Sequence, residues 1–109
     1  MNWAHDISYL FGGIFLANAV PHFVSGMMGR AFQTPFAKPP GKGLSSSTVN
    51  VLWGSANFVI AYFLIACVGD FDLHAADHVI AAGAGILLMG LFAARTFGRF
   101  HGGNSPEDS

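Results

Sequence analysis

Residues 7–28 read ISYLFGGIFLANAVPHFVSGMM, an apolar stretch without an acidic or basic side chain other than one histidine. As a helix this stretch would be about 33 Å long at ~1.5 Å per residue, which is enough to cross a hydrocarbon core of ~30 Å. Two further apolar stretches follow at residues 49–68 and at roughly 75–97. The sequence therefore predicts an all-α integral membrane protein, a bundle of three transmembrane helices.

The five basic residues of the chain all lie on one side of these stretches. Arg30, Lys38 and Lys42 follow the first stretch, and Arg95 and Arg99 close the third. The segment before the first stretch and the connection at residues 69–74 contain neither lysine nor arginine. Because positively charged short loops stay in the cytoplasm, we expect the N-terminus outside and the C-terminus inside.

Composition agrees with a membrane location. Hydrophobic residues make up 52% of the 109 residues and charged residues 10%, whereas soluble domains carry about 25% charged residues. We expect one transmembrane domain over residues 1–101 and a disordered cytoplasmic tail over residues 102–109. No basic stripe suggests a nucleic-acid partner. A first span that is retained and the small size favour the inner membrane of a bacterium, with membrane lipids as neighbours.

Polar residues and a proline interrupt the first predicted helix. Pro21 cannot donate a backbone hydrogen bond, so a kink is expected there. Asn18, His22 and Ser25 recur at a spacing of three to four residues and share one face of the helix. Because an unpaired polar group in hydrocarbon costs several kcal/mol, this face is expected to turn toward protein.

A second polar stripe marks the helix predicted over residues 49–68, which follows a run of helix-capping residues at 45–48. Asn57 on this stripe lies at nearly the same depth as His22 if the two helices are antiparallel, because each residue advances the helix by ~1.5 Å. The sequence therefore predicts a ligand-binding cluster of His22, Asn18, Asn57 and Ser25 in the inner half of the bundle.

Two interpretations of His22 remain open. An ionisable side chain within a membrane span suggests function by default, as a proton relay or a contact to a quinone or a lipid headgroup. Alternatively, a neutral His22 only bonds Asn18, Asn57 or a carbonyl freed by Pro21 and holds the helices together. Haem would need a second axial histidine at the same depth, which this chain does not supply, so the cofactor stays unknown.

A group of histidines and acidic residues is expected at the outer rim. His74 and His78 are four residues apart, on one helix face if the helix begins by His74, and with Asp77 they could bind Zn²⁺ or Cu²⁺. An ordinary solvated rim is the competing interpretation, and it is the one that we favour.

The connection at residues 30–44 is rich in proline and glycine, which excludes a regular helix. Arg30, Lys38 and Lys42 are expected to contact lipid phosphates, while Phe32 and Phe36 enter the headgroup boundary.

No catalytic residues are predicted, because no serine or cysteine lies beside a plausible base and no pair of carboxylates lies within a span. The third stretch is rich in glycine and alanine, which lets helix backbones approach closely. This pattern favours a small accessory or scaffold subunit that associates with itself or with a larger membrane complex. The alternative is a membrane protein that binds a small ligand, a quinone or a lipid, or moves protons, through the His22 cluster.

Overall fold

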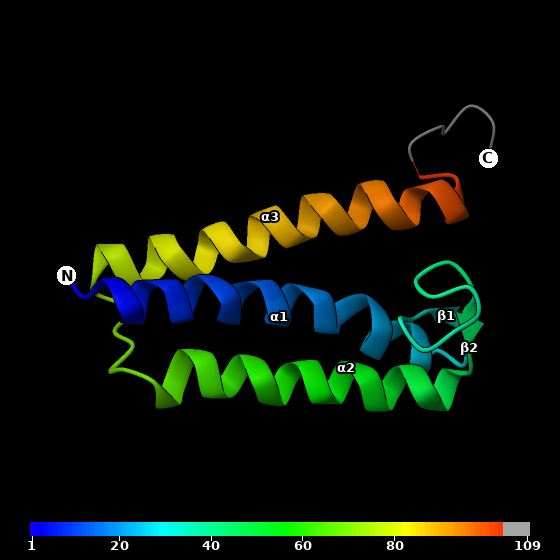
Figure 1. The fold of residues 1–109 in the computed structure, drawn as a ribbon, viewed down its shortest axis with the longest axis horizontal. Coiled ribbons are helices and arrows are strands. Elements are labelled where there is room, and N and C mark those ends of the chain that lie inside the picture. The colour runs from blue at the N-terminus through cyan, green and yellow to red at the C-terminus, as the bar shows by residue number, and fades with distance from the viewer. Residues whose placement is uncertain (104–109) are drawn as a thin grey trace.

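The computed structural model describes residues 1–103. It contains three long helices, and the second is extended by a π-helix: α1 (Trp3–Met27), α2 (Ser47–Tyr62), η1 (Phe63–Cys67) and α3 (Ala76–His101). α1 lies between α2 and α3, which pack on either side of it and scarcely contact each other (Figure 1). Of the predicted tail at residues 102–109, residues 104–109 lie outside the described part of the chain.

Three helical segments are long and apolar enough to cross a membrane: Trp3–Met27, Ser47–Cys67 and Ala76–His101. This confirms the prediction of a mostly helical protein with three apolar spans. α1 begins earlier than predicted because the side chain of Asn2 accepts a hydrogen bond from the backbone N–H of His5 and caps the helix (3.1 Å). α1 continues through Pro21 to Met27, and the kink at this proline stays a prediction.

The helices approach one another through glycine. A methyl group on Gly85 would lie 2.0 Å from the carbonyl oxygen of Leu10, and one on Gly13 would lie 2.1 Å from the carbonyl oxygen of Ala82. Gly54 meets α1 in the same way, with an added methyl group 2.7 Å from the backbone nitrogen of Phe23. Both interfaces of α1 therefore depend on residues without a side chain, as is common between membrane helices.

Polar side chains occupy much of the interior. The largest side chains that are fully buried in residues 1–103 are Tyr9, Asn50, Asn57 and Thr34. Another polar group binds the π-helix: the hydroxyl of Ser8 donates to the carbonyl oxygen of Leu64 (2.6 Å). Because apolar side chains gain little by leaving lipid for a protein interior, such polar contacts contribute to holding membrane helices together.

The connection between α1 and α2 folds back over one end of the helices, with no helix in it, as predicted. It contains two short strands, β1 (Phe32–Gln33) and β2 (Leu44–Ser45), which pair antiparallel. In Figure 1 this connection lies at the same end of the molecule as the C-terminal end of α3. The basic residues at positions 30, 38, 42 and 99 are thus gathered at one end, and Asp6, Asp70 and Asp72 at the other.

Candidate functional site

Asn50 connects α2, α1 and the folded connection. Its side chain is fully buried, and its amide nitrogen lies within hydrogen-bond distance of the carbonyl oxygens of Phe32 (3.1 Å), Ser45 (3.2 Å) and Ser46 (3.0 Å). Its oxygen lies 2.9 Å from Nδ1 of His22. Because the Asn50 oxygen can only accept, His22 donates through Nδ1–H. The imidazole proton of neutral His22 is therefore on Nδ1, and Nε2 carries a free electron pair.

A second amide pair lies beside the first. The amide nitrogen of Asn18 donates to the side-chain oxygen of Asn57 (3.0 Å), and the amide nitrogen of Asn57 donates to the carbonyl oxygen of Trp53 (2.8 Å). The Asn18 oxygen has no hydrogen-bond partner among residues 1–103. Asn18 therefore keeps an acceptor.

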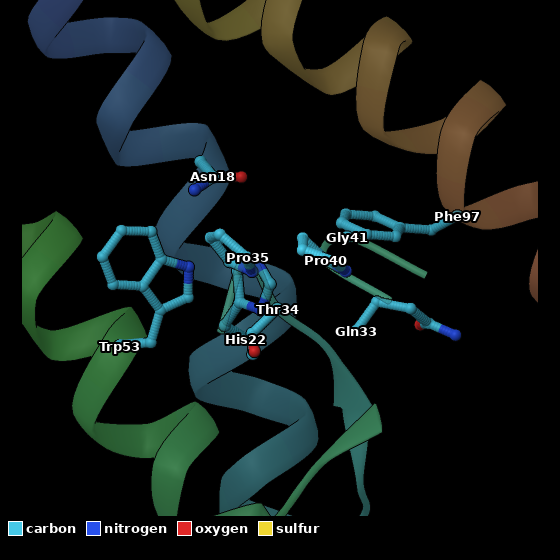
Figure 2. A pocket seen from close by; sticks show the side chains of 9 residues that line it. All are labelled: Asn18, His22, Gln33, Thr34, Pro35, Pro40, Gly41, Trp53 and Phe97. Carbon is cyan, nitrogen blue, oxygen red and sulfur yellow. The ribbon is translucent and has the colours of Figure 1, made fainter. Parts of the chain in front are cut away.

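A cavity of about 320 Å³ lies against these side chains (Figure 2). It is bounded by all three helices and by the connection between α1 and α2. Its lining consists of Asn18, His22, Gln33, Thr34, Pro35, Pro40, Gly41, Trp53 and Phe97. No acidic side chain, lysine or arginine is among them, and four of the nine residues are proline or apolar aromatic rings.

The ring of His22 is 2% exposed and is surrounded by aromatic rings. It makes edge contacts with Phe32 and Phe97, at centroid distances of 5.4 and 5.7 Å, and lies 6.4 Å from Trp53. Nε2 of His22 has no hydrogen-bond partner among residues 1–103. The indole nitrogen of Trp53 is buried and also has none. The unused groups of the cavity therefore include a donor in Trp53 and acceptors in His22 and Asn18.

The connection is fixed to α3 as well as to α1. Phe32 stacks on the ring of His101 (5.1 Å, 5° between the planes) and contacts Phe97, and its place at the headgroup boundary stays a prediction. Gln33 is buried, and its oxygen lies 3.0 Å from Nε2 of His101. Phe36 is 63% exposed, in keeping with a position at the headgroup boundary.

The predicted cluster is thus divided in two. Asn18 pairs with Asn57, and His22 pairs with Asn50, which was not predicted to belong to the cluster. Ser25 lies half-buried one turn beyond His22, and it is not part of the cavity lining. The contributions of Trp53 and of the connection were also not predicted from the sequence.

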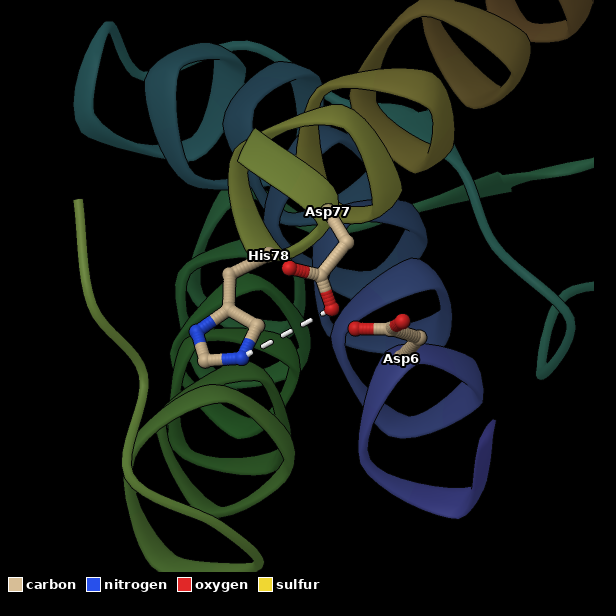
Figure 3. A group of neighbouring side chains, drawn as sticks. All are labelled: Asp6, Asp77 and His78. Atoms are coloured by element: carbon tan, nitrogen blue, oxygen red, sulfur yellow. Dashed lines mark ion pairs between the residues drawn. The ribbon is translucent and has the colours of Figure 1, made fainter. Parts of the chain in front are cut away.

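A separate polar group lies at the opposite end, where Asp6 of α1 faces Asp77 and His78 of α3 (Figure 3). One potential ligand atom from each of the three lies within 4.8 Å of the others. The backbone N–H of Asp72 donates to Nδ1 of His78 (3.0 Å), so the proton of the neutral ring is on Nε2, 3.9 Å from the Asp77 carboxylate. The ring therefore turns a donor, and not a free electron pair, toward the carboxylates.

His74 is not part of this group. α3 begins at Ala76, so His74 precedes the helix and does not share a helical face with His78. Its side chain is 97% exposed and contacts the Asp72 carboxylate (3.2 Å). Of the predicted metal ligands, only Asp77 and His78 lie together, and Asp6 takes the place expected for His74.

Comparisons of the chain with the models of known protein families, with curated proteins and with solved structures find no match.

Proposed function

We propose that this protein is an integral membrane protein that binds a small uncharged ligand in the cavity beside His22. The observation that carries the proposal is the composition of the cavity. Its volume of about 320 Å³ falls at the lower end of the ~300–1,000 Å³ of small-molecule sites, which typically combine apolar walls with a few placed polar groups. Three unused polar groups from α1 and α2 lie in these walls. One of them, the indole N–H of Trp53, is buried without an acceptor, which is unfavourable.

The lack of charge in the lining supports an uncharged ligand. A phosphate or carboxylate placed in this cavity would meet no arginine or lysine among the lining residues. Burial of an unpaired charge is far more costly than burial of a neutral group. A neutral ligand that forms hydrogen bonds with the three unused groups avoids the cost of burying an unpaired charge.

Binding of a ligand in the cavity can be tested by comparing the native chain with a variant in which a larger side chain blocks the cavity. We expect an extract of the host's membrane lipids and small molecules to raise the unfolding temperature of the purified protein in nanodiscs. A ligand at about 100 times its Kd would add about 2.7 kcal/mol to the free energy of unfolding. Pro35→Trp, which adds an indole at the cavity wall, should abolish this response.

Leu44→Trp is the matched control, because Leu44 belongs to the same connection, is exposed and does not line the cavity. It should respond as the native chain does. An equal response by Pro35→Trp and the native chain would show that the extract acts elsewhere, and would contradict the proposal. His22→Ala is less informative, because it also removes the bond to Asn50.

A second candidate function is that of an accessory subunit that associates with itself or with a larger membrane complex. It is favoured by the outer side of α3, where Gly83 and Gly90 have no atoms near the position of an added methyl group and Leu87 and Leu91 are exposed. Such a surface of small and apolar residues permits close packing of another helix. The two candidates use different faces of the molecule and are compatible.

We further propose a multi-pass location in the inner membrane of a bacterium, with the N-terminus outside and the C-terminus inside. The gathering of Arg30, Lys38, Lys42 and Arg99 at one end supports this orientation. The same residues would contact lipid phosphates there. Alkaline phosphatase is expected to be inactive when fused after residue 103 and active when inserted at residues 69–74. The reverse pattern would contradict the orientation.

A further inference from the structure

We infer that the ligand of the His22 cavity carries a hydroxyl group on a flat ring, the chemistry of a quinol or another phenol. This inference rests on the proposed function and adds the chemical class of the ligand. It follows from the hydrogen-bonding roles that the surrounding protein imposes on His22 and Trp53, and from the shape of the walls.

The first step concerns His22. Asn50 is held by backbone carbonyl groups of Phe32 and Ser45, which fix its amide nitrogen as the donor and its oxygen as the acceptor. Asn50 thereby fixes the proton of the neutral imidazole on Nδ1. Nε2 of His22 can then only accept, so its partner must donate. A carbonyl or ether oxygen of a ligand cannot fill that role.

The second step concerns Trp53. Its indole nitrogen can only donate, it is buried, and it has no acceptor among residues 1–103. The rings of Trp53 and His22 are 6.4 Å apart between centroids. A hydroxyl group accepts from an N–H and donates to an imidazole nitrogen, so it offers the role that each of the two side chains requires. The Asn18 oxygen offers an acceptor for a second hydroxyl on the same ligand.

The third step concerns the walls. The rings of Phe97, Pro35 and Pro40 line the cavity, together with the indole of Trp53 (Figure 2). Aromatic rings pack favourably against other aromatic rings, in offset or edge-to-face arrangements. A water molecule would satisfy the polar atoms, but it would leave these apolar walls hydrated. A flat hydroxylated ring fits the polar atoms and the walls together.

Binding can be measured with a matched pair of probes. Decylubiquinol, kept reduced, carries two ring hydroxyl groups, and its dimethyl ether has the same ring and tail without an O–H. Titration of the purified protein in nanodiscs, followed by calorimetry, is expected to show binding of the quinol at least about tenfold tighter than that of the ether, because the ether leaves Nε2 of His22 without a donor. A tail-free hydroquinone is titrated in parallel.

Two variants complete the experiment. Trp53→Phe keeps an aromatic ring and removes the N–H, so it should weaken binding of the quinol by about tenfold. Trp3→Phe makes the same change at an exposed position near the N-terminus, away from the cavity, and should leave binding unchanged. Tighter binding of the quinol than of the tail-free hydroquinone would identify a membrane quinol as the source of the ring, and equal binding would identify a water-soluble phenol.

Equal binding of the quinol and its ether, no binding of either phenol, or unchanged binding by Trp53→Phe would each overturn the inference. These outcomes differ from a failure of the proposed function itself. If the proposed function itself fails, the membrane extract would stabilise the native chain and Pro35→Trp alike. If only the hydroxyl inference fails, the extract still stabilises the native chain and not Pro35→Trp.

Discussion

Gly85→Ala is expected to lower the free energy of unfolding by about 3 kcal/mol, at the upper end of the effect of overpacking a close contact. The added methyl group would lie 2.0 Å from the carbonyl oxygen of Leu10 and 3.0 Å from the backbone nitrogen of Ile14. Both are backbone atoms of α1, so no rotation of a side chain relieves the clash and the two helices must separate. Thermal unfolding in detergent micelles, followed by circular dichroism, measures the effect.

Gly83→Ala is the matched control, since it lies two residues away on the same helix and its added methyl group meets nothing within 4 Å. It should leave the unfolding temperature unchanged or raise it slightly. Equal stability of the two variants would mean that α1 and α3 are not in the close contact described above.

The larger Gly83→Ile tests the accessory role, because it should reduce association detected by native mass spectrometry without lowering stability. Undiminished association would count against that face of α3.

Asn50→Leu is expected to cost about 4 kcal/mol and to release the connection between α1 and α2. The substitution leaves the Nδ1–H of His22 and the carbonyl oxygens of Phe32 and Ser45 without the partners described above. Each buried polar group that loses its partner costs about 1–3 kcal/mol. The carbonyl of Ser46 keeps a partner, because the backbone N–H of residue 50 donates to it. Unfolding temperature measures the loss of stability, and the rate of tryptic cleavage after Lys42, which precedes a glycine, measures release of the connection.

Thr48→Ala serves as the control, because Thr48 is exposed in the same turn of α2 and makes no side-chain hydrogen bond with residues 1–103. Cleavage of this variant should proceed at the native rate. If Asn50→Leu were cleaved no faster than Thr48→Ala, the connection would be held by its aromatic contacts to Phe97 and His101, and not by Asn50.

The helices could be predicted because the residues that determine each helix lie within it or directly beside it in the sequence. Three apolar stretches of sufficient length leave few other folds, and the capping role of Ser46 at the start of α2 follows from a run of hydroxyl side chains. The start of α1 was placed four residues late, because the polar residues 3–6 interrupt the apolar pattern. They do not interrupt the helix, since Asn2 supplies the cap.

The site was less accessible to sequence reasoning. Comparison of depths along two antiparallel helices brought Asn18 and Asn57 to the same region, where they do lie together. The same comparison did not select Asn50 for His22, because the second span was taken to begin at residue 49. α2 begins at Ser47, two residues earlier, which moves Asn50 about 3 Å deeper into its helix. The fold of the connection, which supplies the carbonyl groups around Asn50, depends on contacts distant in sequence and has no local signal.

The central position of α1 has a consequence for biosynthesis. α1 precedes α2 and α3 in the chain, and each of them packs on α1 far more than on the other. The docking surface of each later helix is therefore already synthesised when that helix leaves the ribosome, so neither has to wait for a helix that is still to be made. α1 and α2 can pair first through Gly54 and the asparagines, and the cavity is completed only when α3 brings Phe97 and His101 against the connection.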